Sequence, residues 1–80
     1  MSKAFVVYSK DNCGFCEKLA AFMEQKGIQY TKYKLGEDFS RDEFIAEFGA
    51  GSTFPRVTYG EELIGGMKET VKYLVENGHV

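Results

Sequence analysis

The sequence has too few metal-binding side chains for a closed zinc site. Its 80 residues contain two cysteines and one histidine, His79, which is second from the C-terminus. A structural zinc ion usually takes four Cys or His ligands, often from two CxxC pairs. A zinc site within one chain is therefore not expected, and we interpret His79 as a solvated residue of a frayed terminus.

Strong charge and long apolar stretches are also missing. Ten Lys and Arg residues against twelve Asp and Glu give a net charge of −2, without a basic stripe, so nucleic acid is not an expected partner. No apolar run reaches the length of a membrane span or a signal-peptide core. The first three residues lead directly into a strand pattern, so we expect a cytoplasmic protein. In that reducing compartment a CxxC pair is more often catalytic than structural.

The chain instead alternates strand and helix patterns within one expected domain, residues 1–80. The composition is 44% hydrophobic, enough for a compact core, and no repeat or linker divides it. Strands are expected at residues 4–9, 28–35, 56–59 and 62–64, and helices at 13–26, 40–48 and 67–77. This order predicts an α/β fold with a four-stranded mixed sheet: a parallel βαβ unit, then an antiparallel hairpin that turns at Gly60-Glu61.

The faces of the later helices follow from their apolar spacing. Ser40 and Glu43 have the spacing of a capping box, which marks the start of the middle helix. That helix is expected to bury Phe44, Ile45 and Phe48. The last helix is expected to bury Met67, Val71, Leu74 and Val75.

Cys13-Gly14-Phe15-Cys16 is the motif that indicates a chemistry. In the first turn of a helix the two Cα atoms would lie roughly 5 Å apart, within the range of a disulfide. Unpaired N–H groups and the helix dipole favour a thiolate at Cys13, and Lys10 adds positive charge that Asp11 partly offsets. Cys16 continues the apolar stripe of the helix, where burial favours the neutral thiol. We interpret Cys13 as the attacking cysteine and Cys16 as the resolving one.

Two other interpretations of the cysteine pair stay open on these residues. A purely structural disulfide fits poorly, because so short a loop removes little conformational entropy from the unfolded chain. Two unrelated buried cysteines are the other alternative, since free cysteines are often buried.

Three segments of the sequence resemble the glutaredoxins, which belong to the thioredoxin superfamily. Residues 8–16 resemble their active-site stretch, in which a Lys commonly stands three residues before a Cys-Pro-Tyr-Cys motif. Thr53-Phe54-Pro55 resembles their Thr-Val-Pro segment, and Gly65-Gly66 the glycine pair before their last helix. The similarity extends over essentially the whole chain. It implies a thioredoxin-like fold and a cis peptide bond before Pro55, close to the cysteines.

The resemblance also implies a glutathione site around the cysteine pair. The backbone of Phe54, between Thr53 and Pro55, would pair with the cysteinyl part of glutathione like an added strand. Phe15 keeps the aromatic surface of the family motif, where Tyr is usual. Tyr8 and the remaining phenylalanines are expected in the core.

Charged groups and a helix terminus complete the implied site. Lys10 and Arg41 match regions near the glycyl carboxylate of glutathione. The helix that begins near Gly66 and Met67 would present N–H groups to the glutamyl carboxylate. The family often has an Asp here that holds the glutamyl amine, whereas this chain has Met67-Lys68-Glu69.

The resemblance therefore implies a glutathione-dependent thiol–disulfide oxidoreductase that reduces protein disulfides and glutathione mixed disulfides. Glutathione would be its reducing co-substrate, with no tightly bound cofactor, and ribonucleotide reductase is one suggested protein substrate of an expected monomer. Two alternatives stay open: a redoxin reduced by thioredoxin reductase, and a dimeric [2Fe–2S] carrier with Cys13 and glutathione as ligands. Cys-Gly-Phe also begins the Cys-Gly-Phe-Ser motif of monothiol glutaredoxins. Cys16 stands in place of that serine, which favours the dithiol interpretation.

Overall fold

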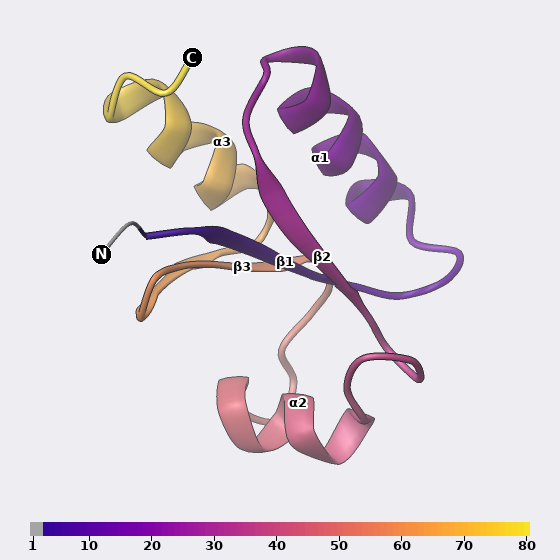
Figure 1. Ribbon diagram of the computed structural model, residues 1–80. Helices are drawn as coiled ribbons and strands as arrows, with labels where there is room; N and C mark the ends of the chain where they lie inside the picture. Colours follow the sequence, from indigo (N-terminus) through magenta and orange to yellow (C-terminus); the bar gives the residue numbers. More distant parts are fainter. Residues whose placement is uncertain (1–2) are drawn as a thin grey trace.

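The computed structural model describes residues 3–80 and has the expected order of elements (Figure 1). The strands are β1 (Phe5–Ser9), β2 (Tyr30–Lys34), β3 (Arg56–Tyr59) and β4 (Glu62–Gly65), and the helices are α1 (Gly14–Gln25), α2 (Arg41–Phe48) and α3 (Met67–Glu76). The sheet order is β2-β1-β3-β4, in which β1 and β2 are parallel and the other neighbours antiparallel. The predicted mixed sheet is confirmed, although β2 and α1 are shorter at both ends than expected.

The alternating side chains of β1 separate the two faces of the sheet. One face is covered by α1 and α3, and α2 lies on the opposite side (Figure 1). The core on the α1/α3 face consists of six buried side chains: Phe5, Val7, Leu19, Met23, Val57 and Leu74. Because α1 packs on this face directly after β1, its N-terminal end lies at the carboxyl edge of the parallel strands.

Aromatic rings attach α2 to the opposite face. Phe44 is buried, with its ring centroid 4.9 Å from that of Phe48. Tyr8 of β1 lies 5.0 Å from Phe48. The predicted capping box is present: Ser40 Oγ accepts the N–H of Glu43 at 3.1 Å, and Glu43 Oε1 accepts the N–H of Ser40 at 2.9 Å. This cap fixes the start of α2 beside the loop that precedes it.

Two apolar residues that the sequence pattern placed in the core are exposed. Ile45 is 36% exposed and Val75 is 58% exposed. Each follows a buried residue of its helix, Phe44 or Leu74, so a rotation of about 100° per residue turns it away from the sheet. None of the helices within residues 3–80 is long and apolar enough to cross a membrane.

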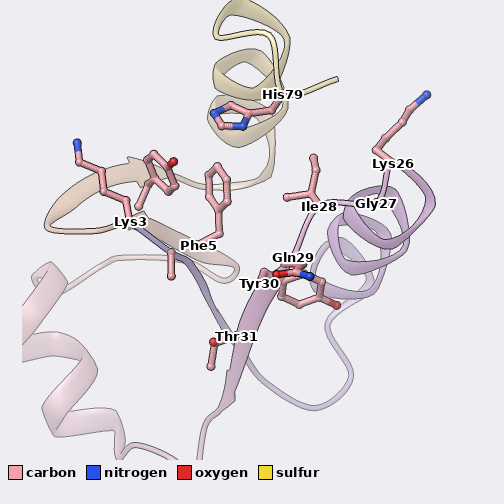
Figure 2. A pocket seen from close by; sticks show the side chains of 11 residues that line it. Lys3, Phe5, Lys26, Gly27, Ile28, Gln29, Tyr30, Thr31 and His79 are labelled. Carbon is pink, nitrogen blue, oxygen red and sulfur yellow. The ribbon is translucent and has the colours of Figure 1, made fainter. Parts of the chain in front are cut away.

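The C-terminal end of the chain is held against the sheet. Gly78 has a φ of 72°, which lets the N–H of His79 donate to the carbonyl of Leu74 at 2.9 Å. The imidazole lies edge-on to the ring of Phe5, with the two centroids 5.3 Å apart (Figure 2). It is also edge-on to the ring of Tyr59, at 5.7 Å between centroids. His79 is exposed, as expected, but the terminus is not frayed there, because an aromatic surface at the start of β1 contacts its ring.

Gly65 joins β4 to α3 with a backbone conformation that other residues rarely adopt. Its φ is 128°, and a Cβ at this position would lie 2.9 Å from Cβ of Glu69. We predict that Gly65→Ala lowers the free energy of unfolding by about 1–3 kcal/mol, measured by urea denaturation.

Gly14→Ala is the matched control for this prediction. Gly14 begins α1, and a Cβ there would meet nothing within 4 Å. Because Ala is the better helix former, the free energy of unfolding should stay constant or rise by up to about 1 kcal/mol. An equal loss in both variants would contradict the steric explanation for Gly65.

Candidate active site

Cys13 and Cys16 form a disulfide at the N-terminal end of α1. Their Cα atoms are 5.2 Å apart, in agreement with the distance expected from the sequence. Cys13 is 7% exposed and Cys16 is 2% exposed, so Cys13 is the less covered of the two. Cys16 shares the buried face of α1 with Leu19 and Met23, as predicted. The pair is therefore the reversible redox element that its spacing indicates.

Cys13 is the N-cap residue of α1, one position before the helix that was expected to include it. Asn12 has a φ of 56°, a left-handed conformation that Asn tolerates, and it turns the chain toward the helix start. The backbone N–H of Cys16 donates to Cys13 Sγ at 3.1 Å. A donor directed at this sulfur, at the positive end of the helix dipole, favours a Cys13 thiolate once the disulfide is reduced.

The Phe54–Pro55 peptide bond is cis, as the resemblance to glutaredoxins implies. Pro55 is buried, and its carbonyl oxygen lies 3.6 Å from the position that a Cβ would take on Gly66. Gly66 is the N-cap residue of α3. The proline turn and the start of α3 therefore lie against each other.

A groove of about 470 Å³ lies beside Cys13. It brings together five of the residues singled out in the sequence: Lys10, Phe15, Arg41, Thr53 and Phe54. The Lys10 amino group is 5.6 Å from the centroid of the Phe54 ring, and Phe15 is 62% exposed. The described residues that line the groove include two cations, Lys10 and Arg41, and no acid. The groove therefore carries a positive charge next to the redox-active sulfur.

A second hollow of about 240 Å³ shares Phe15, Thr53 and Phe54 with this groove and extends to the start of α3. Its other lining residues are Pro55, Gly66, Met67, Lys68 and Glu69. Glu69 Oε1 accepts the N–H of Gly66 at 3.1 Å. One of the helix N–H groups expected to bind a ligand carboxylate therefore already has a partner. The spacing Gly-x-x-Glu, with Glu three residues after the N-cap, is the sequence signal for this contact.

Other groove residues carry no signal in the sequence. Ile45, expected in the core, lines the groove together with Leu35 and Ser52. Ser52 Oγ donates to the carbonyl of Phe48 at 2.7 Å, which ties the loop after α2 to the end of that helix. These residues reach the groove because this loop folds back, and no local pattern predicts that course.

A cavity of about 490 Å³ lies at the other end of β1 (Figure 2). Figure 2 shows that its walls come from the starts of β1 and β2, the end of α1 and His79. It contains neither cysteine. Because open α/β sheets place their sites at the carboxyl ends of the strands, we assign the redox chemistry to the groove beside Cys13.

The family model for glutaredoxin matches residues 5–64 of this chain. The chain belongs to the glutaredoxin family. The matched range includes both cysteines and the cis Pro55. Family membership and the Cys13–Cys16 pair together support thiol–disulfide chemistry at this site.

Its relatives include proteins of similar and of greater length. This glutaredoxin is 30% identical over 78 residues to monothiol glutaredoxin-S1 of Arabidopsis thaliana, covering 94% of this chain and 76% of that protein. It is 29% identical over 72 residues to monothiol glutaredoxin-4 of Schizosaccharomyces pombe, covering 90% of this chain but 29% of that protein. The chain therefore corresponds to one part of the longer relatives.

Solved glutaredoxins share the fold of this one. Glutaredoxin 1 from Francisella tularensis, crystallised with cacodylate, has a TM-score of 0.75 at 20% identity and covers 95% of each chain. A buckwheat glutaredoxin–glutathione complex has a TM-score of 0.69 at 28% identity, covering 95% of this chain and 71% of that one. The predicted thioredoxin-like fold is confirmed.

We predict that alkylation of the reduced glutaredoxin at mildly acidic pH modifies Cys13 before Cys16. The N-cap position and the N–H of Cys16 stabilise the Cys13 thiolate, whereas Cys16 lies among apolar side chains. Limiting iodoacetamide followed by mass spectrometry of the peptides identifies the modified residue. Cys16→Ser should be alkylated at the rate of the unaltered protein. Cys13→Ser should be alkylated at least about tenfold more slowly. Modification of Cys16 first would reverse the two roles.

Proposed function

We propose that this glutaredoxin is a glutathione-dependent oxidoreductase that reduces glutathione mixed disulfides and protein disulfides. The observation that carries the proposal is the Cys13–Cys16 disulfide beside a groove with two cations, Lys10 and Arg41. Glutathione ends in a glycyl carboxylate, which suits such a groove. The cytoplasm, where thiols are kept reduced, is the proposed location.

Glutathione in this proposal lies along the two hollows with its sulfur at Cys13. Its glycyl carboxylate points toward Lys10 and Arg41, and its cysteinyl main chain pairs with the backbone of Phe54, before the cis Pro55. The similar buckwheat glutaredoxin that was solved with glutathione supports this choice of ligand.

The glutamyl end of glutathione carries a carboxylate and an amine. At the start of α3 the N–H of Met67 and the side chain of Lys68 suit the carboxylate. Glu69 lies in the same hollow, holds Gly66 through one oxygen and keeps a negative charge for the amine. Glu69 would thus serve where the family often has an Asp.

The reaction begins with attack of the Cys13 thiolate on the glutathione sulfur of a mixed disulfide. The Cys13–glutathione bond forms as the substrate S–S bond breaks, and the substrate leaves as a thiolate that takes up a proton. A second glutathione thiolate then attacks the bound glutathione sulfur, which releases glutathione disulfide and restores the Cys13 thiolate.

With a protein disulfide as substrate, Cys16 completes the reaction. The Cys13 thiolate attacks one substrate sulfur, and the Cys16 thiolate then displaces the reduced protein from Cys13. The Cys13–Cys16 disulfide that results is reduced by two glutathione molecules, which become glutathione disulfide. Ribonucleotide reductase is one proposed protein substrate.

A second candidate function is a [2Fe–2S] carrier with Cys13 and glutathione as ligands in a dimer. The similarity to relatives named monothiol glutaredoxins and the sequence Cys-Gly-Phe favour it. The disulfide between Cys13 and Cys16 favours the oxidoreductase instead. A brown colour after anaerobic purification would support the carrier, and colourless protein with its full thiol content would count against it.

NADPH consumption with glutathione, glutathione reductase and a glutathione mixed disulfide measures the proposed reaction. We predict turnover that disappears in Cys13→Ser and persists in Cys16→Ser, because only Cys13 attacks this substrate. With a protein disulfide as substrate, the turnover rate of Cys16→Ser should be well below that of the unaltered protein. Turnover supported by thioredoxin reductase, and not by glutathione, would identify the other reductant and overturn the proposal.

The cations of the groove test where glutathione lies. We predict that Lys10→Gln raises KM for a glutathione mixed disulfide about fivefold with little change in kcat, because a charge-assisted contact is lost in ground and transition states alike. Lys18→Gln is the matched control, since Lys18 lies 5.7 Å from the Phe15 ring but does not line the groove. It should change KM by less than about twofold. Equal increases in both variants would contradict the assigned position.

A further inference from the structure

Another pocket adjoins α2, and neither cysteine lines it. Its volume is about 300 Å³, and four of its walls are the rings of Tyr8, Tyr33, Phe39 and Phe48. The ring centroids of the other three lie 5.0–5.6 Å from that of Tyr8, with interplanar angles of 71–72°.

Three carboxylates stand around these rings: Asp38, Glu43 and Glu47. Asp38 Oδ2 accepts the backbone N–H of Lys34 at 2.9 Å, and Glu43 belongs to the capping box of α2. Both are thus fixed in place while they keep their charge. Burial, followed by the Glu47 carboxylate, raises the pKa of Tyr8, which agrees with a position of Glu47 close to that ring. We call this site the acidic aromatic pocket.

The basic groups nearby do not neutralise the acidic aromatic pocket. Its described lining residues include no Lys, Arg or His. The Lys34 amino group is paired with Asp11 at 2.8 Å and Glu37 at 3.7 Å, neither of which lines the pocket. Arg56 faces Tyr8 in the β1–β3 register but does not line the pocket either. The pocket therefore keeps three negative charges beside the negative faces of its rings, the combination that attracts an organic cation.

The acidic aromatic pocket is a neighbour of the groove beside Cys13, which we call the redox groove. The ring of Phe44 lines both, so the two hollows lie on either side of one side chain. The charged residues that line the redox groove are the cations Lys10 and Arg41, whereas those that line the pocket are all acids. A substrate that extends from Cys13 past Phe44 would therefore reach the negatively charged acidic aromatic pocket.

We propose that the acidic aromatic pocket binds an arginine or lysine side chain of the protein substrate while the substrate's disulfide is held at Cys13. This rests on the proposed function, because it assumes a protein disulfide at that cysteine. A guanidinium or ammonium group on a flexible apolar stem matches aromatic walls with carboxylates at the rim. The same negative field repels phosphate and acidic peptide segments, so protein substrates with a basic residue near the reactive cysteine are preferred.

Binding without any redox step tests the pocket by itself. N-acetylarginine N-methylamide is titrated into the oxidised protein, and its neutral citrulline analogue serves as the uncharged probe. NMR amide spectra should show saturable shifts at Tyr33, Phe39 and Glu47 with the arginine probe only. Glu47→Gln should weaken this binding about fivefold, because it removes one charge and keeps the side-chain shape. Glu76→Gln, at an exposed position of α3, removes the same charge elsewhere and should leave binding unchanged.

Kinetics then test whether the pocket acts on substrates. A series of peptides carries one internal disulfide between two cysteines, so that glutathione does not occupy the groove beside Cys13 during the attack, and arginine or citrulline stands at successive positions on either side. We expect one position at which arginine raises kcat/KM about tenfold over citrulline. This arginine-to-citrulline ratio should be near one in Glu47→Gln and unchanged in Glu76→Gln. A small glutathione mixed disulfide, which carries no arginine, should be reduced equally by the unaltered protein, Glu47→Gln and Glu76→Gln.

The outcomes separate this inference from the proposed function. Shifts spread over every acidic surface residue, or equal shifts with both probes, would overturn the pocket. Specific binding of the arginine probe without any arginine preference among the peptides would overturn its role in substrate choice. If the protein binds the arginine probe but does not turn over with glutathione, the proposed function fails and the cation pocket stands.

Discussion

The packing of α1 against β1 determines where the active end of the molecule lies. Leu19 and Met23 are fully buried against Phe5 and Val7, and each such side chain stabilises the fold by about 1.5–3 kcal/mol. Because α1 begins a few residues after β1 ends, this packing holds the N-terminal end of the helix at the carboxyl edge of the sheet. The groove beside Cys13 lies at this edge, and the hollow that shares Phe15, Thr53 and Phe54 with it extends to the cis-proline turn and the start of α3.

The pitch of α2 separates charges of opposite sign. Arg41 and Ile45, four residues apart, line the redox groove, whereas Glu43 and Glu47, also four apart, line the acidic aromatic pocket. A cation in the first turn of a helix opposes the helix dipole, and Asp42 and Glu43 in the same turn offset it. The helix thus has one charge, at Arg41, that is unfavourable for its dipole, and it lines both the redox groove and the acidic aromatic pocket.

Much of this architecture is predictable from local patterns. The apolar stripe that includes Cys16, the capping box of Ser40 and the turn after Tyr59 each depend on residues close in sequence, so the elements, the parallel βαβ unit and the hairpin follow. The pairing of β3 with β1 joins segments far apart in sequence and does not follow from these patterns. The environments of Ile45 and His79 do not follow, because each is decided by a distant segment: the folded-back loop after α2, or the aromatic surface at the start of β1. The resemblance to glutaredoxins identified the groove residues, whereas the acidic aromatic pocket becomes visible only when β1, β2 and α2 are assembled.

The hydrogen bond to the Cys13 sulfur comes from the backbone of residue 16 and not from its side chain. The donor is therefore indifferent to which residue occupies that position, provided the first turn of α1 keeps its course. A serine there, as in Cys-Gly-Phe-Ser, would remove the second thiol and leave the anion-stabilising environment of the first intact. In evolutionary terms, two-thiol and one-thiol chemistries are neighbours on this scaffold, separated by one substitution that leaves the hydrogen bond to Cys13 in place.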